Sequence, residues 1–398
     1  MKPLENIRIL DLTNVLAGPF CCHQLAHMGA EVIKVEIPGS GDLARQLGAD
    51  PELNEKFMGV SFLAQNSGKK SITINLKAEE GKDLFKKMVR TADVVVENFR
   101  PGVMDRLKVG YETLIKENPS LVYCAISGFG QDGPLKDLPA YDQIIQGMSG
   151  VMSITGNRDN APLRVGYPMA DTIGGMTAAF AISSALYNRK GNEGCFLDIS
   201  MLESVISTMG WVVSNYLVAG KSPEPMGNDN FTASPSGTLN TGDGLINIAA
   251  NKQEQFEAVC DVVGRSDLKE DPRFTKRQSR LEHREELKNL LEEAMSSNDA
   301  RTWRDRLNAK GVPAGCVVNV EDALGHEQIA SRGMIATFDD TPGVDREIKI
   351  ARPGVKLNGD PIVTTTPPPA LGQHTDELLM ELGLSREEIK QLKEKEVV

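Results

Sequence analysis

Residues 7–36 read IRILDLTNVLAGPFCCHQLAHMGAEVIKVE, and this stretch determines the class of fold. Its two ends are short apolar runs with the length and composition of buried strands. Between them, Gly18-Pro19 opens a predicted helix over residues 20–28, because proline is favoured in a first helical turn, and Gly29 ends it. Strand, helix and strand in this order predict a βαβ unit, which implies a parallel sheet with a right-handed crossover.

The same alternation of elements continues along the chain. Apolar runs predict further strands and helices, the strands at residues 71–76, 93–97, 121–126 and 195–200 and the helices at residues 77–91, 172–186 and 201–219. With 398 residues, 40% of them hydrophobic and 25% charged, the chain has the composition of a globular protein with more than one domain. We therefore expect an α/β protein.

A change of composition near residue 220 marks a predicted domain boundary. Residues 221–237 are rich in Pro, Gly, Asn and Ser, which predicts a linker or mobile loop. Hairpin signals and charge-rich helical segments follow over residues 238–325, and they predict a smaller α+β domain. The N-terminal part of the large domain then occupies residues 1–220, and residues 326–398 form a tail that ends in two short helices.

The charge and cysteine content argue against several classes of function. A net charge of −11 disfavours nucleic acid and anionic membranes as partners. The chain lacks a run of about eighteen apolar residues that would cross a membrane, and its first residues lack the apolar core of a signal peptide. The six cysteines form no CxxC pair and predict buried free thiols. We expect a soluble, cytoplasmic protein.

Asp171 is the main candidate for chemistry. Residues 166–175 read GYPMADTIGG and place this carboxylate directly before a small and apolar helical run. Aspartate is favoured in front of a helix because its side chain accepts a free amide proton, so Asp171 is predicted to be an N-cap. The position also lies near the amides of residues 172–175 and suits a nucleophile whose acyl adduct needs oxyanion donors. From these residues alone, both alternatives stay open.

The loops after the predicted strands carry no clear cofactor signature. Residues 13–19 read TNVLAGP and lack the GxGxxG cradle of a nicotinamide or flavin enzyme. Residues 128–133 have that spacing, but Pro134 and a polar stretch follow instead of a helix. His23 and His27 have the spacing of two metal ligands without a third, so no metal site is predicted.

The loop that begins at Asn98 follows a predicted strand, and this is where open α/β sheets bind ligands. Phe99, Arg100 and Arg106 lie in or just after it. The two arginines are either ligands of an anion or solvated surface residues, and the residues themselves do not decide between these alternatives.

Motifs in several loops stand in a fixed order along nearly the whole chain. They are ILDL and AGP within residues 9–19, GAEVIKVE at 29–36, GSGD at 39–42, VENFRPG at 96–102, SGFGQDGP at 127–134, AD at 170–171 and LGQHT at 371–375. Together they resemble the family III CoA-transferases, the CaiB/BaiF group that includes formyl-CoA:oxalate and crotonobetainyl-CoA:carnitine CoA-transferases. The resemblance implies a Rossmann-like large domain that residues 326–398 complete, a smaller middle domain, and two chains threaded through each other as an interlocked homodimer.

The resemblance also implies a set of site residues. Asp171 matches the catalytic aspartate of the family. The implied contacts with CoA are at Val15, Lys69, Asn98, Phe99 and Arg106, with Arg100 as a further candidate in the same loop. The implied substrate-side residues are Leu16, Tyr141, Asp142, Gly174 and Gly175. No metal and no permanently bound cofactor is implied, because coenzyme A and acyl-CoA are the substrates.

We therefore predict an acyl-CoA:carboxylate CoA-transferase that works through a covalent aspartyl intermediate. Its expected partners are an acyl-CoA and a small carboxylic acid. Arg45, Arg100 and Arg164 are candidates to pair with a second carboxylate, which favours a dicarboxylic acid as acceptor.

Two alternatives belong to other classes of function. An α-methylacyl-CoA racemase of the same superfamily needs a histidine base, and none lies between His27 and His283. A non-catalytic CoA-binding protein would not need a nucleophile, and the intact motif around Asp171 argues against it.

Overall fold

The protein contains two compact units. The structure is a computed structural model, and it describes residues 2–189 and 193–398. The large unit comprises the described residues of Met1–Val151, Arg164–Lys221 and Glu327–Val398, and the small unit comprises Met152–Leu163 and Ser222–His326. Local sequence patterns carry no signal that Met152–Leu163 belongs to the small unit. The predicted domain limits, including the linker at residues 221–237, stay predictions.

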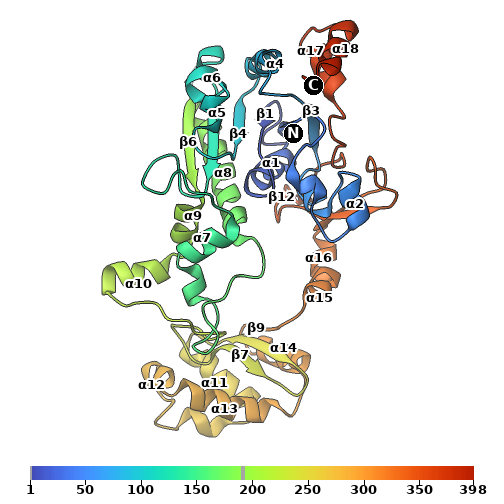
Figure 1. The fold of residues 1–398 in the computed structure, drawn as a ribbon. Helices are drawn as coiled ribbons and strands as arrows, with labels where there is room; N and C mark the ends of the chain where they lie inside the picture. The colour runs from blue at the N-terminus through green and yellow to red at the C-terminus, as the bar shows by residue number, and fades with distance from the viewer. Residues whose placement is uncertain (1, 190–192) are drawn as a thin grey trace. The chain divides into compact units, whose positions relative to one another are not determined.

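A six-stranded parallel sheet forms the centre of the large unit, in the order β3-β2-β1-β4-β5-β6 (Figure 1). The strands are β1 (Arg8–Asp11), β2 (Glu31–Glu36), β3 (Lys69–Thr73), β4 (Val94–Glu97), β5 (Val122–Ser127) and β6 (Cys195–Ser200). Every neighbouring pair in this sheet runs parallel, and Arg8 lies opposite Glu31. The predicted βαβ unit and the α/β class are therefore confirmed.

The strand order changes direction between β1 and β4. From β1 the chain moves outward through β2 to β3, and it then returns to place β4 on the other side of β1. In open α/β sheets, ligands bind at the carboxyl ends of two strands that diverge in this way. The loops that follow Asp11 and Glu97 begin at this point of the sheet.

Successive residues of each strand enter two separate hydrophobic cores, because side chains alternate across a strand. Leu10 and Val95 belong to one core, and their neighbours Ile9 and Val94 belong to the other. The first core includes residues of α4 (Glu79–Val89), α6 (Tyr111–Glu117), α17 (Thr375–Glu381) and α18 (Arg386–Glu394). The second core includes residues of α1 (Ala17–His27), α7 (Asp142–Met148), α8 (Met169–Asn188) and α9 (Met201–Thr208).

The C-terminal segment completes the first of these cores. Leu378 and Val397 are buried in it. The Asn75 N–H donates to the Val397 carbonyl at 2.8 Å, and the Thr73 N–H donates to Thr375 Oγ1 at 3.1 Å. Residues from both ends of the sequence therefore form one core.

Shorter elements complete the large unit. They are η1 (Leu43–Gln46), α2 (Pro51–Glu55), α3 (Val60–Leu63), α5 (Val103–Arg106), α10 (Trp211–Ala219), α16 (Glu327–Ser331), β10 (Ile335–Phe338), β11 (Ile348–Ala351), β12 (Lys356–Leu357) and β13 (Asp360–Pro361). β10 pairs antiparallel with β11, and β12 with β13. A single turn, η2 (Val151–Ile154), lies where the chain passes from one unit to the other.

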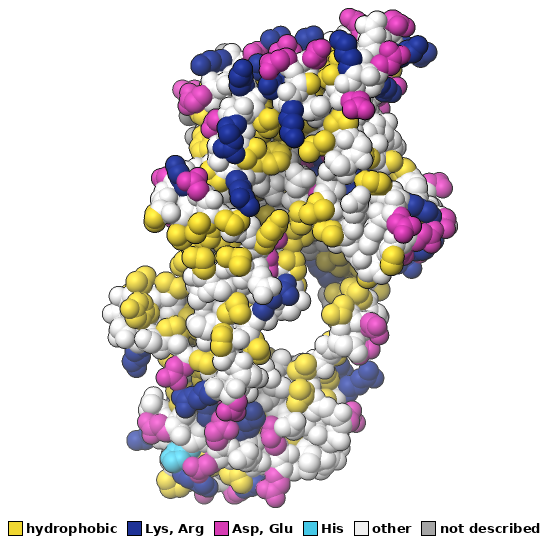
Figure 2. Space-filling view, viewed as in Figure 1, with side chains coloured by type: hydrophobic (Ala, Val, Ile, Leu, Met, Phe, Trp, Pro, Cys, Tyr) yellow, Lys and Arg dark blue, Asp and Glu magenta, His cyan; other side chains and the backbone are white. Residues whose placement is uncertain are grey.

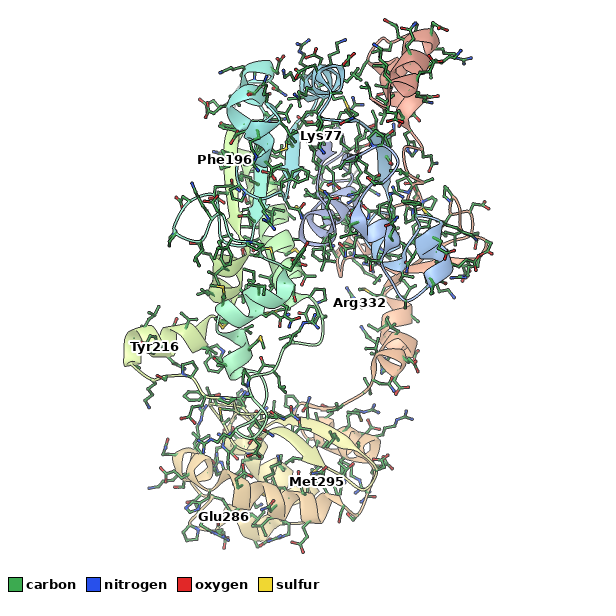
Figure 3. The ribbon with its side chains drawn as sticks, in the orientation of Figure 1. Lys77, Phe196, Tyr216, Glu286, Met295 and Arg332 are labelled. Carbon is green, nitrogen blue, oxygen red and sulfur yellow. The ribbon has the colours of Figure 1, made fainter. Side chains whose placement is uncertain are left out.

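The small unit is built on a three-stranded antiparallel sheet of β7 (Ser236–Asn240), β8 (Leu245–Ala249) and β9 (Ala314–Cys316). The predicted hairpin around residues 241–244 joins β7 to β8 and is confirmed. Its helices are α11 (Gln253–Val262), η3 (Ser266–Lys269), α12 (Arg277–Glu282), α13 (Arg284–Met295), α14 (Ala300–Asn308) and α15 (Val320–Gly325). On α13, Met295 is buried in the core of this unit, whereas Glu286 is exposed (Figure 3).

Within the described ranges, we find no helix with both the length and the apolar composition that a bilayer crossing requires.

Candidate active site

The loop after β1 is held in a strained conformation at the diverging strands. Val15 has φ of +65°, a region that β-branched residues rarely adopt and that marks stored strain. Its N–H donates to Asp42 Oδ1 at 2.9 Å. The side chain of Asn98 accepts from the Asn14 N–H at 2.8 Å and donates to the Asn14 carbonyl at 2.9 Å. The structure thus brings Val15 and Asn98, two predicted CoA contacts, into one site.

Two buried ion pairs lie beneath this loop. Lys69 Nζ lies 2.8 Å from Asp11 Oδ2, and Lys34 Nζ lies 2.9 Å from Asp42 Oδ2, with all four side chains 0% exposed. Burial alone would raise the pKa of Asp11, but Lys34 and Lys69 hold it below its usual value. Lys34 also donates to the Thr13 carbonyl at 2.8 Å, so the ion pairs fix the loop.

The structure gives Lys69 a role different from the predicted contact with CoA. Besides its pair with Asp11, its ammonium donates to the Pro19 carbonyl at 3.0 Å in the interior. To reach a ligand, it would have to leave the buried Asp11 carboxylate without the ammonium that contacts its Oδ2, which is strongly unfavourable. The sequence alone does not distinguish this buried lysine from its partly exposed neighbour Lys70.

Arg100 and Arg106 are exposed near the carboxyl end of β4, and neither forms an ion pair with any residue that the structure describes. Gly102, with φ of +77°, lies beside Arg106, because an added Cβ would come within 3.2 Å of its Nη1. Phe99 is half-buried, and its N–H donates to Glu97 Oε2 at 2.8 Å. Two guanidinium groups are therefore available for an anion such as phosphate.

Asp171 is the third residue of α8, so the prediction that it is the N-cap is wrong. The helix begins at Met169, and Pro168 precedes it without a side-chain cap. Asp142, the first residue of α7, supplies the missing acceptor: its Oδ1 accepts from the Ala170 N–H at 2.8 Å and from the Asp171 N–H at 3.4 Å. A cap from a distant part of the sequence therefore lets the helix start earlier than the local pattern indicates.

The prediction that the amides of residues 172–175 serve as oxyanion donors is also wrong. The Thr172 N–H donates to the Pro168 carbonyl at 3.1 Å, and residues 174 and 175 lie inside the helix, where amides bond to the preceding turn. Gly174 and Gly175 are buried and serve close packing. An added Cβ on Gly175 would lie 2.4 Å from the Ala17 carbonyl oxygen, and one on Gly174 would lie 2.8 Å from Met201 Cγ.

The Asp171 carboxylate lies on the same face of α8 as Gly175, one turn closer to the helix start. Since Gly175 touches the first residue of α1, the first turn of α8 lies beside the start of α1, which Leu16 precedes. The structure gives the Asp171 side chain no hydrogen bond to any residue it describes. Burial, and then the charge of Asp142, raise the pKa of Asp171 to about 7.

The other predicted substrate-side residues have contrasting environments. Tyr141 is 70% exposed and immediately precedes α7, whereas Asp142 is buried. His23 and His27 contact each other through Nε2 atoms 3.0 Å apart, and His23 Nε2 lies 2.8 Å from Ser67 Oγ. Across residues 2–189 and 193–398, no group of three or more His, Cys, Asp or Glu side chains is placed to hold a metal ion.

An open parallel sheet whose strand order changes direction, together with a partly buried carboxylate at the start of α8, is typical of α/β proteins that bind small molecules. A model of CoA-transferase family III matches residues 4–375, and the chain belongs to this family. It is therefore a CoA-transferase, and the resemblance of its motifs to this family is confirmed. Coenzyme A thioesters are the substrates of the family.

Curated relatives and solved structures agree with this membership. The acetyl-CoA:oxalate CoA-transferase of Acetobacter aceti is 41% identical over 335 residues, which cover 84% of this chain and 85% of the relative. The succinyl-CoA:glutarate CoA-transferase of Mus musculus is 36% identical over 383 residues, which cover 96% of this chain and 87% of the relative. The crystal structure of a CaiB/BaiF family protein from Brucella suis has a TM-score of 0.83 at 34% identity, covering 96% of this chain and 99% of that one.

Lys69 and Lys70 provide a matched pair of substitutions that separates a structural lysine from a ligand. We expect Lys69→Met to lower the free energy of unfolding by about 3–5 kcal/mol, because Asp11 would stay buried without its partner. Lys70→Met removes only partly exposed ion pairs and should change it by less than about 1 kcal/mol. Unfolding in urea measures the change in the free energy of unfolding for each of the two variants. If Lys69→Met kept its stability and lost only affinity for CoA, Lys69 would be a ligand.

Proposed function

We propose that this enzyme transfers CoA from an acyl-CoA to a free dicarboxylic acid through a covalent intermediate on Asp171. The observation that carries the proposal is the carboxylate of Asp171 itself, which is partly buried at the start of α8 and free of hydrogen bonds to the described residues. The two relatives named above act, by their names, on oxalate and glutarate, and both acids carry two carboxylates.

The environment of Asp171 supports a role as nucleophile. A carboxylate in water is a weak nucleophile because hydration and hydrogen bonds stabilise its charge. Burial and the neighbouring charge of Asp142 raise the pKa of Asp171 to about 7, so a substantial fraction of the group is ionised at neutral pH and is more basic than an ordinary carboxylate. These two properties are the ones that attack on a thioester requires.

The reaction follows as a series of balanced exchanges. An Asp171 oxygen attacks the thioester carbonyl, the C–S bond breaks, and a mixed anhydride and CoA thiolate form. The thiolate then attacks the Asp171 carbonyl, which releases the donor acid as a carboxylate and leaves an aspartyl-CoA thioester. The acceptor carboxylate attacks that thioester and expels the thiolate to give a second anhydride. Attack of the thiolate on the acceptor carbonyl finally yields the new acyl-CoA and restores Asp171.

We assign the CoA phosphates to Arg100 and Arg106, with Val15, Asn98 and Phe99 forming the adjoining wall. Both guanidinium groups are exposed near the carboxyl end of β4, and neither forms an ion pair with a described residue. Asn98 ties its own loop to the backbone of Asn14, so the two loops provide one surface for the ligand. The acyl group would then lie toward Leu16 and Tyr141.

Of the candidate arginines for the second carboxylate, Arg164 fits best. Arg45 is completely buried, and two of its nitrogens donate to Glu36 oxygens at 2.7 and 2.8 Å, so it is not free to bind an acid. The side chain of Arg164 is 43% exposed and lies 3.7 Å from Asp142 Oδ2, a loose contact that leaves most of its donors free. Asp142 links Arg164 to the first turn of α8, because its other oxygen accepts from the Ala170 N–H.

We further propose an interlocked homodimer built on Rossmann-like large domains, in a reducing compartment such as the cytoplasm. Helix α10 has no buried residue, although it carries Trp211, Tyr216 and Leu217. Hydrophobic side chains are visible on the surface of this helix in Figure 2, and Figure 3 labels Tyr216 on it. Phe180 of α8 is 73% exposed. Several large apolar side chains exposed on neighbouring parts of the sequence support an interface with a second chain. Four of the six cysteines are buried free thiols, which supports the reducing compartment.

Replacement of Asp171 tests the nucleophile. Asp171→Ala and Asp171→Asn should lose transfer activity by about a thousandfold or more while still binding CoA. In the unaltered enzyme, kcat/KM should fall about tenfold per pH unit below about 7, because protonation removes the nucleophile. Rates come from exchange between acyl-CoA and acid, read by the mass of the CoA product. Near-normal exchange in Asp171→Ala would refute the mechanism.

Arg164→Gln tests the assignment of the second carboxylate. It should raise the KM for oxalate or glutarate by about 10- to 100-fold, the effect of losing a charged hydrogen bond, and leave the KM for a monocarboxylic acceptor such as acetate unchanged. Arg90→Gln is the matched control, since Arg90 is an exposed arginine that pairs with Glu117 on the other face of the sheet. An equal rise in the KM for mono- and dicarboxylic acceptors would exclude this role for Arg164.

The oligomeric state tests the interface. We expect sedimentation equilibrium to give the mass of two chains, and Leu217→Glu to weaken the association, because it would place a charge on the apolar surface of α10. Ser297→Glu, which adds a charge at an exposed position of the small unit, is the control. A single-chain mass at micromolar concentration would contradict the dimer.

A further inference from the structure

Asp142 takes no part in the reaction steps proposed above, yet both oxygens of its carboxylate have polar contacts. It is 7% exposed. Its Oδ1 accepts from the Ala170 N–H at 2.8 Å and the Asp171 N–H at 3.4 Å. Its Oδ2 accepts from Gln146 Nε2 at 2.7 Å and lies 3.7 Å from Arg164 Nη2. Both oxygens therefore have partners, and none of these contacts leaves an oxygen free for a substrate.

Gln146 fixes the orientation of this carboxylate. Its side chain is fully buried one turn after Asp142 on α7. Nε2 also donates to the Tyr167 carbonyl at 3.2 Å, and Oε1 accepts from the Val165 N–H at 2.9 Å. The segment that leads into α8 is thus bonded to the same side chain that holds Asp142, so the cap and the helix start form one rigid assembly.

The cap determines which partners the Asp171 carboxylate has. An aspartate in the first turn of a helix often accepts hydrogen bonds from the free amides there, and such bonds stabilise its charge and reduce its basicity. Here Asp142 occupies the amides of Ala170 and Asp171 itself, while the Met169 N–H donates to the Tyr167 carbonyl at 2.8 Å. The first-turn amides therefore have other acceptors, and the carboxylate of Asp171 stays free.

We propose that Asp142 is the positioning residue of this active site: it caps the helix that carries Asp171 and keeps the Asp171 carboxylate free and weakly stabilised for attack. The inference rests on the proposed role of Asp171 as the nucleophile. It assigns Asp142 to the helix start, and not to direct contact with the acyl group or the acceptor acid.

The charge of Asp142 acts in the same direction as its geometry. After burial, it is the group that raises the pKa of Asp171. Asp142 is the charged group that acts on Asp171, and the residues that close on α8 one turn later, at Gly174 and Gly175, are uncharged: Ala17, Phe20 and Cys21 of α1 and Met201 of α9. Arg164 lies beside Oδ2 of Asp142, the oxygen that does not accept from the helix start. Removal of the Asp142 charge should lower the pKa of Asp171, and removal of the Arg164 charge should raise it further.

Three substitutions separate this role from a purely structural one. Asp142→Asn keeps an oxygen acceptor for the helix start but removes the charge, which should lower the pKa of Asp171. The acid limb, the fall of kcat/KM for the acyl-CoA at low pH, should therefore move down by about one pH unit. Arg164→Gln, at a partly exposed position, should move it up. Asp142→Ala removes cap and charge together and should lower kcat about tenfold or more at every pH, with recovery in Asp142→Asn at pH 8.

Asp137→Asn, an exposed aspartate in the loop before α7, is the matched control and should leave the profile unchanged. An unmoved acid limb in both Asp142→Asn and Arg164→Gln overturns the inference. Trapping with borohydride after incubation with acyl-CoA tests the proposed function separately. An adduct on Asp171 together with an unmoved limb refutes only the role of Asp142, whereas an active Asp171→Ala enzyme without an adduct refutes the nucleophile as well.

Discussion

Two buried ion pairs, Lys69 with Asp11 and Lys34 with Asp42, are the contacts on which the candidate site depends. Each charge has lost its hydration, so each partner is stable in the interior only while the other is present. The same groups bind the loop after β1 through Thr13 and hold it at a backbone angle that is unfavourable for a β-branched residue. The ion pairs thereby make this loop rigid where a ligand would meet it.

At the start of α8, two identical side chains have contrasting environments. Asp142 has donors on both oxygens and serves as a structural anion, whereas Asp171 has none among the described residues and is partly withdrawn from water. In many enzymes, two neighbouring carboxylates have different pKa values because their environments differ, and only one of them reacts. The difference here arises from which aspartate reaches the free amides of the helix.

The sequence allowed the strands of the parallel sheet, the α/β class and the family to be predicted, because these depend on local apolar runs and on motifs in a fixed order. The cap of α8 could not be predicted, since its acceptor lies 29 residues earlier in the chain. The interior position of Lys69 and the packing role of Gly175 likewise depend on contacts between distant segments. A local sequence pattern predicts secondary structure, but it does not predict which distant residue a side chain will contact.

The last residues of the sequence line the hydrophobic core beneath α4 and bond to the end of β3. A ribosome releases this segment only after every strand of the parallel sheet has emerged. Helices α4 and α6 can pack on this face of the sheet as they emerge, but the part of the core that Leu378 and Val397 fill stays open until the C-terminal segment is made. A core that stays incomplete until the last segment is made exposes apolar surface for longer during synthesis, and such surface is prone to aggregation.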